Sequence, residues 1–263
     1  MIKETIKLGG RDLTIESGKM ARQASGSCVV TYGETSLLVA VTASKGVEEY
    51  RGFFPLSVEY REKFYAAGRI PGGFFKREAR PTENEILASR LTDRPLRPLF
   101  PKGFNNETRV DIYVLSYDSE NEADVLSALG ASFSLLISDI PWNGPVATVR
   151  VGRIDGELKI NPLKSEMEES DINIVVSGTS DSIMMVEGEC DFISDNPCSA
   201  SNSGITRELI SSASAFLFLS CSSSFAISSS FAFNFTHSCA IVVTSTLSKR
   251  SVESSNIISL TFT

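Results

Sequence analysis

Aromatic and basic side chains gather in one short segment that follows the turn residues Pro71-Gly72-Gly73. The phenylalanines and cations of this segment are Phe74, Phe75, Lys76, Arg77 and Arg80. Cations neutralise phosphates, and aromatic rings stack on unpaired bases, so this combination is typical of binding to single-stranded nucleic acid. Because glycines have no side chains to pack, we expect the segment to form an exposed loop.

A second group of cations follows at short spacing. Arg90, Arg94 and Arg97 come just before a proline-rich stretch, and Asp93 stands among them. Two interpretations remain open. The arginines contact phosphates of a nucleic acid, or they form salt bridges at the end of a helix, with Asp93 as the partner that orients them.

The sequence gives little support for a nucleotide-binding loop, for histidine-based catalysis or for a metal site. The glycine-rich stretch 68–73 lacks the GxxxxGK[ST] pattern of a phosphate-binding loop, and the only histidine, His237, lies in a stretch of unusual composition. Asp111, Asp118 and Asp124 could suggest a metal, but a strand edge or a helix start accounts for each of them. We therefore predict no catalytic residue and no metal ligand.

Composition narrows the class of protein. The chain has 263 residues, a net charge of −7 and a pI near 5.0, which argues against a broadly basic protein that coats DNA. No apolar run is long enough to span a bilayer, and the start of the chain has no signal-like apolar core. The five cysteines form no CxxC pair, which favours free thiols in a reducing cytoplasm.

The character of the sequence changes near residue 190. Residues 191–263 contain 21 serines and only seven charged side chains, and they show neither helical nor strand periodicity. We expect one compact domain over 1–190 and a poorly ordered tail over 191–263. Two origins of the tail remain open: an inverted or misassembled reading frame, whose antisense translation would be rich in Glu, Lys and Ala, or a genuine serine-rich disordered segment.

Hydrophobic patterning over the first 190 residues predicts an α+β fold, because strands and helices mix without strict βαβ alternation. Thr82 and Glu85 form a capping box that starts a helix over about 83–92, and apolar spacing predicts an amphipathic helix over about 122–138. Asp155-Gly156 predicts a hairpin turn. The strands are expected at 13–17, 26–31, 36–42, 56–60, 110–115, 146–151, 157–160, 172–176 and 183–186.

Several motifs together closely resemble the first RNase PH-type core of bacterial polynucleotide phosphorylase. The resemblance runs from about Ile2 to Glu189 and rests on motifs of high specificity. These motifs are Glu16-Ser17-Gly18-Lys19-Met20-Ala21-Arg22-Gln23, Tyr32-Gly33-Glu34-Thr35, Gly72-Gly73-Phe74-Phe75-Lys76-Arg77-Glu78, the stretch from Arg90 to Phe100, Ser138-Asp139-Ile140-Pro141-Trp142-Asn143-Gly144-Pro145 and Met184-Met185-Val186-Glu187-Gly188-Glu189.

The resemblance implies an RNase PH-like fold (ribosomal protein S5 domain 2-like) and a 3′-to-5′ phosphorolytic exoribonuclease. In that family inorganic phosphate attacks the 3′-terminal phosphodiester of RNA, and the reaction requires Mg²⁺. The proteins form homotrimeric rings. RNA threads the central pore of the ring past a loop that matches Phe74, Phe75, Lys76 and Arg77 here. Lys76 replaces an arginine that is frequent in the family, which keeps the charge but loses the bidentate fork.

The resemblance also marks what this chain lacks. The family's residues that bind phosphate and metal lie chiefly in a second core, which has no match here. The chain is therefore expected to carry the RNA-guiding first core. The alternative is a truncated, catalytically inactive fragment that only binds RNA or serves as a scaffold.

Overall fold

A computed structural model describes residues 1–46, 52–72, 80–180 and 182–190, all of which belong to one compact unit. Phe74, Phe75, Lys76 and Arg77, and the whole expected tail over 191–263, lie outside the described residues. The strands of the described part are β1 (Ile2–Leu8), β2 (Arg11–Ser17), β3 (Gly26–Tyr32), β4 (Thr35–Ala43), β5 (Leu56–Glu62), β6 (Thr108–Ser116), β7 (Ala147–Ile154), β8 (Glu157–Ile160), β9 (Ile172–Gly178) and β10 (Ile183–Cys190). The helices are η1 (Phe64–Ala67), α1 (Glu83–Leu96), η2 (Arg97–Leu99), α2 (Ala123–Leu136) and α3 (Lys164–Met167).

The strands form two sheets. The larger sheet has the order β1-β2-β3-β4-β6-β5, and the smaller has the order β10-β9-β7-β8. All neighbours are antiparallel except β5 and β6, which run parallel and are connected through α1. The mixed larger sheet and the packed helices confirm the predicted α+β class.

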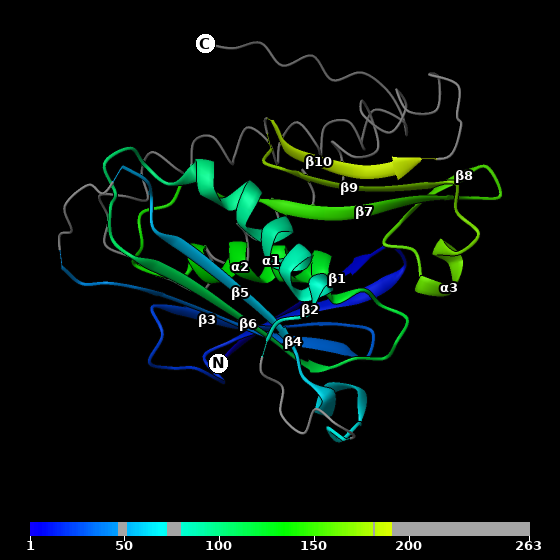
Figure 1. Cartoon of the computed structure of the whole chain (residues 1–263), viewed down its shortest axis with the longest axis horizontal. Coiled ribbons are helices and arrows are strands. Elements are labelled where there is room, and N and C mark those ends of the chain that lie inside the picture. Colours follow the sequence, from blue (N-terminus) through cyan, green and yellow to red (C-terminus); the bar gives the residue numbers. More distant parts are fainter. Residues whose placement is uncertain (47–51, 73–79, 181, 191–263) are drawn as a thin grey trace, which may run out of the picture. The chain divides into compact units, whose positions relative to one another are not determined.

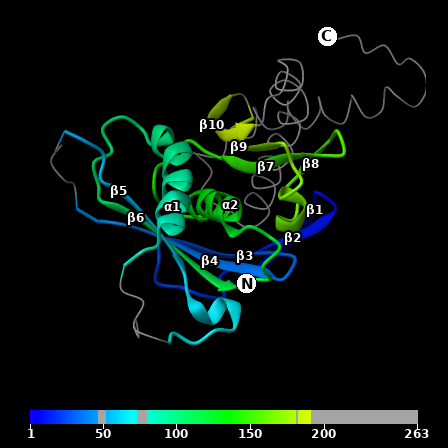
Figure 2. The same cartoon turned by 45° about the vertical axis from the view of Figure 1, so that its right-hand side comes forward.

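Helix α2 lies between the two sheets (Figures 1 and 2). The spacing of its apolar residues predicted an amphipathic helix, yet the helix is buried on nearly every side, from Ala123 to Leu135. Its serines are buried with partners: the Ser132 hydroxyl accepts a hydrogen bond from the Val146 amide at 2.9 Å. The second sheet thus covers the face that sequence periodicity assigns to solvent.

Helix α1 begins as the capping box predicts. The Thr82 hydroxyl accepts a hydrogen bond from the Glu85 amide at 3.3 Å, and the Glu85 carboxylate accepts one from the Thr82 amide at 2.6 Å. The same carboxylate accepts the Glu62 amide at 2.8 Å and so ties the helix start to β5. The helix is longer than predicted, since it continues through Pro95 to Leu96.

One strand differs from the prediction, and one predicted turn is confirmed. The edge strand β1 was not predicted, because Ile2–Leu8 is half-exposed along most of its length and is held by backbone pairing with β2. The hairpin between β7 and β8 was predicted and is confirmed: both turn residues have positive φ, 52° at Asp155 and 81° at Gly156.

Candidate functional site

The outer face of α1 presents two of the predicted phosphate contacts. Arg90 is exposed and makes no ion pair with any residue that the structure describes. One turn further on, Arg94 reaches across to Glu187 of β10, with 2.5 Å between Nη1 and Oε2, and both side chains are about half exposed. An exposed ion pair of this kind is weak, so the phosphate of a ligand could compete for the Arg94 guanidinium.

Arg97 has a different environment. Its Nη1 donates to the Phe54 carbonyl at 2.8 Å, and its Nη2 donates to the Leu56 carbonyl at 3.1 Å. Nε and Nη2 of Arg97 also donate hydrogen bonds to the Asp93 carboxylate, at 3.1 and 2.8 Å. These hydrogen bonds join the end of α1 to the start of β5, which favours a bracing role for Arg97. Phosphate contact by Arg97 stays a prediction.

We expect substitutions of the three arginines to affect different quantities, namely RNA affinity at Arg90 and Arg94 and stability at Arg97. Replacing Arg90 or Arg94 with alanine should weaken binding to single-stranded RNA and lower the slope of log affinity against log salt by about one unit per lost phosphate contact. Arg97→Ala should instead reduce the free energy of unfolding by about 2 kcal/mol, since it removes charge-assisted hydrogen bonds. Binding titrations at several salt concentrations and urea denaturation of the same three variants measure both effects. A smaller salt slope in Arg97→Ala at unchanged stability would contradict the bracing role.

Arg80 is the one residue of the aromatic-basic segment that the structure describes. It is exposed and lies directly before the start of α1. On the other side of the gap, the chain enters the segment from η1, whose last residue is followed by Gly68 in the left-handed conformation with φ of 66°. The described residues that flank the segment therefore lie after β5 on one side and at the N-terminus of α1 on the other.

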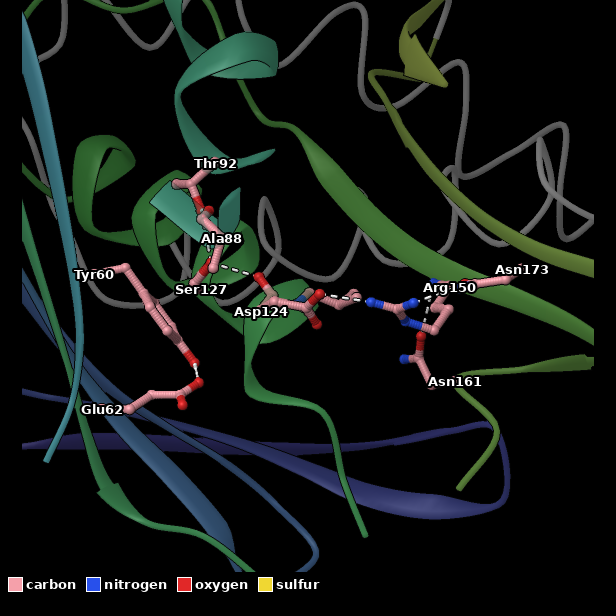
Figure 3. Close-up of polar contacts among 10 residues, drawn as sticks. Tyr60, Glu62, Ala88, Thr92, Asp124, Ser127, Arg150, Asn161 and Asn173 are labelled. Atoms are coloured by element: carbon pink, nitrogen blue, oxygen red, sulfur yellow. Dashed lines mark hydrogen bonds and ion pairs between the residues drawn. The ribbon is translucent and has the colours of Figure 1, made fainter. Parts of the chain in front are cut away.

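Beneath α1, a chain of polar contacts connects α1 with α2 and the smaller sheet (Figure 3). Thr92 donates to the Ala88 carbonyl at 3.1 Å, and its hydroxyl lies 2.6 Å from that of Ser127, which donates to the Asp124 carbonyl. The Asp124 carboxylate pairs with Nη2 of Arg150 at 2.5 Å.

Arg150 is the centre of the second half of this network. Its Nη1 donates to Oδ1 of Asn173 at 2.7 Å, and its backbone amide donates to Oδ1 of Asn161 at 2.9 Å. In this network, two buried donors have no hydrogen-bond partner among the described residues: Nε of Arg150 and Nδ2 of Asn161. Sequence reasoning did not find Arg150 or Asn161, because neither belongs to a motif and each acquires its partners only through tertiary folding.

Arg150 also borders an open pocket of about 590 Å³. The pocket is lined by Glu122, Arg150, Lys164, Met167, Glu168, Ser170, Asp171, Asn173, Glu189 and Cys190. Burial, and then the charge of Asp124, raises the pKa of Glu122 above its ordinary value. Burial likewise raises the pKa of the nearby Tyr60, whose hydroxyl donates to Glu62 at 2.7 Å. The pocket thus combines the Glu122 carboxyl, whose pKa is raised, with the Arg150 guanidinium.

The aspartates considered as metal ligands are occupied by the protein itself. The Asp118 carboxylate accepts hydrogen bonds from the amides of Glu120 and Asn121 at 2.9 and 2.7 Å. Burial alone would raise the pKa of Asp118, but these hydrogen bonds outweigh it and lower the pKa to about 2. Asp111 pairs with Arg109, and Asp124 pairs with Arg150. Across the described ranges no cluster of three or more His, Cys, Asp or Glu side chains could hold a metal ion.

The turn between β3 and β4 explains the Tyr32-Gly33-Glu34-Thr35 motif. Gly33 has a φ of 61°, and a Cβ placed on it would lie 2.6 Å from Nδ2 of Asn121. That amide donates to Asp118 at 2.5 Å. The motif therefore brings the β3–β4 turn and the segment before α2 into close contact, which is a structural role.

None of the helices in the described part of the chain has the length and apolar character needed to cross a membrane.

The fold and the sequence together define the class of protein. The chain matches the description "3' exoribonuclease family, domain 1" over residues 9–141 and "3' exoribonuclease family, domain 2" over residues 144–197. It belongs to the 3′ exoribonuclease family. The junction of the two matches falls between α2 and β7, where the chain passes from the larger sheet to the smaller.

Named relatives make the assignment more specific. A protein of Thermomicrobium roseum is 57% identical over 194 residues, which are 74% of this chain and 25% of that protein. A protein of Geotalea uraniireducens is 53% identical over 193 residues, which are 73% of this chain and 28% of that protein. Both are named polyribonucleotide nucleotidyltransferase, which confirms the resemblance seen in the sequence. The chain spans about a quarter of the length of these relatives.

A solved structure supports the fold independently. The crystal structure of rice (Oryza sativa) Rrp46 superposes with a TM-score of 0.61 at 16% identity, and the match covers 84% of this chain and 96% of that one. The predicted RNase PH-like fold is confirmed.

Proposed function

We propose that this chain is the RNA-guiding core of a 3′-to-5′ phosphorolytic exoribonuclease. In the proposed reaction an oxygen of inorganic phosphate attacks the phosphorus of the 3′-terminal phosphodiester. The 3′ oxygen of the preceding nucleotide leaves, and a nucleoside diphosphate is released. The observation that carries the proposal is the family match over residues 9–141, with relatives named polyribonucleotide nucleotidyltransferase.

The role of this chain's own residues in that reaction is to hold and orient RNA. Arg80 and Arg90 are exposed cations, and the described partner of the Arg94 side chain is the exposed Glu187. All three lie on or beside α1, so a phosphate backbone that follows the helix could neutralise them in turn. Phe74 and Phe75 would stack on the bases while Lys76 and Arg77 contact phosphates.

The proposal extends to features that rest on the resemblance alone. These are a requirement for Mg²⁺, assembly as a homotrimer, and a place in the cytoplasm. The described residues do not fit a Mg²⁺ site, since their candidate aspartates are hydrogen-bonded or ion-paired within the protein. By the resemblance, the Mg²⁺ ligands belong chiefly to the family's second core, and we derive no step through the metal. The free thiol of the buried Cys28, whose pKa burial raises to about 12, is compatible with a reducing compartment.

The loop gives a direct test of RNA guiding. Phe75→Ala should weaken binding to single-stranded RNA by about tenfold, because base stacking on an aromatic is worth about 1–3 kcal/mol. Duplex RNA is the control, since its bases are already stacked and should lose little. If the phenylalanines belong to the core instead, the substitution will lower the melting temperature. A folded Phe74/Phe75 double alanine variant with unchanged affinity would contradict the stacking role.

A second assay tests whether the chain is an active enzyme or a truncated, inactive fragment. Poly(A) is incubated with the chain, with inorganic phosphate supplied or omitted, and released ADP is measured. Release that depends on phosphate would rule out an inactive fragment. RNA binding without release under either condition would assign the chain to the RNA-guiding role only.

A further inference from the structure

An exposed aromatic residue, Tyr65, stands on the short helix η1 at the end of β5 (Figure 1, in cyan). Its side chain is 58% exposed, and the adjacent Phe64 is 48% exposed. Contiguous large apolar side chains that stay exposed can mark a binding surface. The motifs in the sequence do not assign a role to either residue.

The backbone beneath Tyr65 is anchored. The Ala66 amide donates to the Lys63 carbonyl at 2.9 Å, and the Ala66 carbonyl accepts the Tyr117 amide of the neighbouring segment at 3.0 Å. Gly68, in the left-handed conformation, donates its amide to the Tyr65 carbonyl at 3.0 Å, and Arg69 donates to the Phe64 carbonyl at 2.9 Å. A ring presented by such a scaffold loses little conformational freedom when a ligand binds.

Three cations lie near Tyr65 in the sequence. Arg61, Lys63 and Arg69 lie within four residues of Tyr65 in the chain, and Arg69 is exposed. The one acidic side chain in this stretch, Glu62, is exposed and accepts a hydrogen bond from the Tyr60 hydroxyl at 2.7 Å. Because side chains alternate along a strand, Arg61 and Glu62 point to opposite faces of the sheet. An exposed aromatic ring in a segment of the chain that carries cations suits a nucleic acid with unpaired bases.

We propose that Tyr65 is a stacking platform for an unpaired base of single-stranded RNA, beside the entry to the aromatic-basic segment. This inference rests on the proposed RNA-guiding function and deepens it by adding a base-binding position on the anchored part of the fold. It predicts that the tyrosine ring contributes to affinity through its face, and that the hydroxyl contributes little.

The test measures the affinity of the full chain for a fluorescent oligo(A) and for an abasic oligonucleotide of equal length. Tyr65→Ala and Tyr65→Leu should weaken oligo(A) binding by about tenfold, since leucine is apolar but has no π face. Tyr65→Phe should bind as the parent chain does. Binding to the abasic strand should be the same for all four proteins, and the salt slope should stay constant because no phosphate contact is lost.

Phe53 provides the matched control. It is 63% exposed and lies before β5, whereas Tyr65 follows β5, so Phe53→Ala should leave oligo(A) affinity unchanged. Thermal melting of each variant checks that the exposed substitutions leave the fold intact.

The outcomes separate the two proposals. If the parent chain fails to bind single-stranded RNA, both the proposed function and the inference are wrong. If the parent chain binds and Arg90→Ala lowers the salt slope, while Tyr65→Ala binds oligo(A) as tightly as before, only the stacking platform is overturned. An equal loss for Tyr65→Ala with oligo(A) and with the abasic strand would also overturn it, since base stacking would not be the cause.

Discussion

Replacing Arg150 with leucine should lower the free energy of unfolding by about 3 kcal/mol, because it leaves the carboxylate of Asp124 without its partner in a mostly buried site. The Arg150 and Asp124 side chains are only 14% and 19% exposed. The substitution also removes the hydrogen bond from Nη1 to Asn173. Urea denaturation monitored by circular dichroism measures the effect, since a change in midpoint at constant slope reports stability.

Two controls identify the cause of the loss. Arg109 pairs with Glu59 and with Asp111, and the exposed fractions of these three side chains are 49%, 44% and 21%, so this more exposed group should cost less than about 1 kcal/mol in Arg109→Leu. Adding Asp124→Asn to Arg150→Leu should recover part of the loss, because the unpaired buried charge is then removed. Equal losses for Arg150→Leu and Arg109→Leu would contradict a special role for the buried pair.

Gly26→Ala should destabilise the fold by about 3 kcal/mol, because the new methyl group has no room. A Cβ on Gly26 would lie 2.0 Å from the carbonyl oxygen of Ser134 in α2, and a backbone atom inside a buried helix cannot move aside without shifting the helix. Glycine in a strand frequently marks such a close approach. The melting temperature and the urea midpoint should both fall.

Gly46→Ala is the matched control. Among the described residues other than its chain neighbour, none has an atom within 4 Å of a Cβ at Gly46, so alanine there should be neutral or slightly stabilising through the unfolded chain. If Gly26→Ala and Gly46→Ala have the same stability, the packing of α2 on β3 is looser than the structure indicates.

The amino-acid sequence by itself determined the features that depend on near neighbours. The capping box of Thr82 and Glu85 predicted the start of α1, and Asp155-Gly156 predicted the β7–β8 turn. Both are local, since the atoms that satisfy each other lie within a few residues. Long motifs also predicted the family, because many specific residues occur in a fixed order.

The roles of the arginines were decided only by the tertiary structure. Arg90, Arg94 and Arg97 have the same chemistry and similar spacing, so the sequence left phosphate contact and salt bridging open for all of them. Folding brings the Phe54 and Leu56 carbonyls to Arg97, places Glu187 beside Arg94, and leaves Arg90 at the surface. Sequence spacing cannot reveal partners that come from another strand or sheet.

The same limit explains α2 and Arg150. A periodic apolar pattern shows which side of a helix can be buried, but it cannot show that a second sheet will cover the other side as well. Asp124 looked like an ordinary residue of a helix start, and Arg150 like an ordinary strand residue. They meet because α2 and β7 pack together, and only that packing creates the buried ion pair and the pocket beside it.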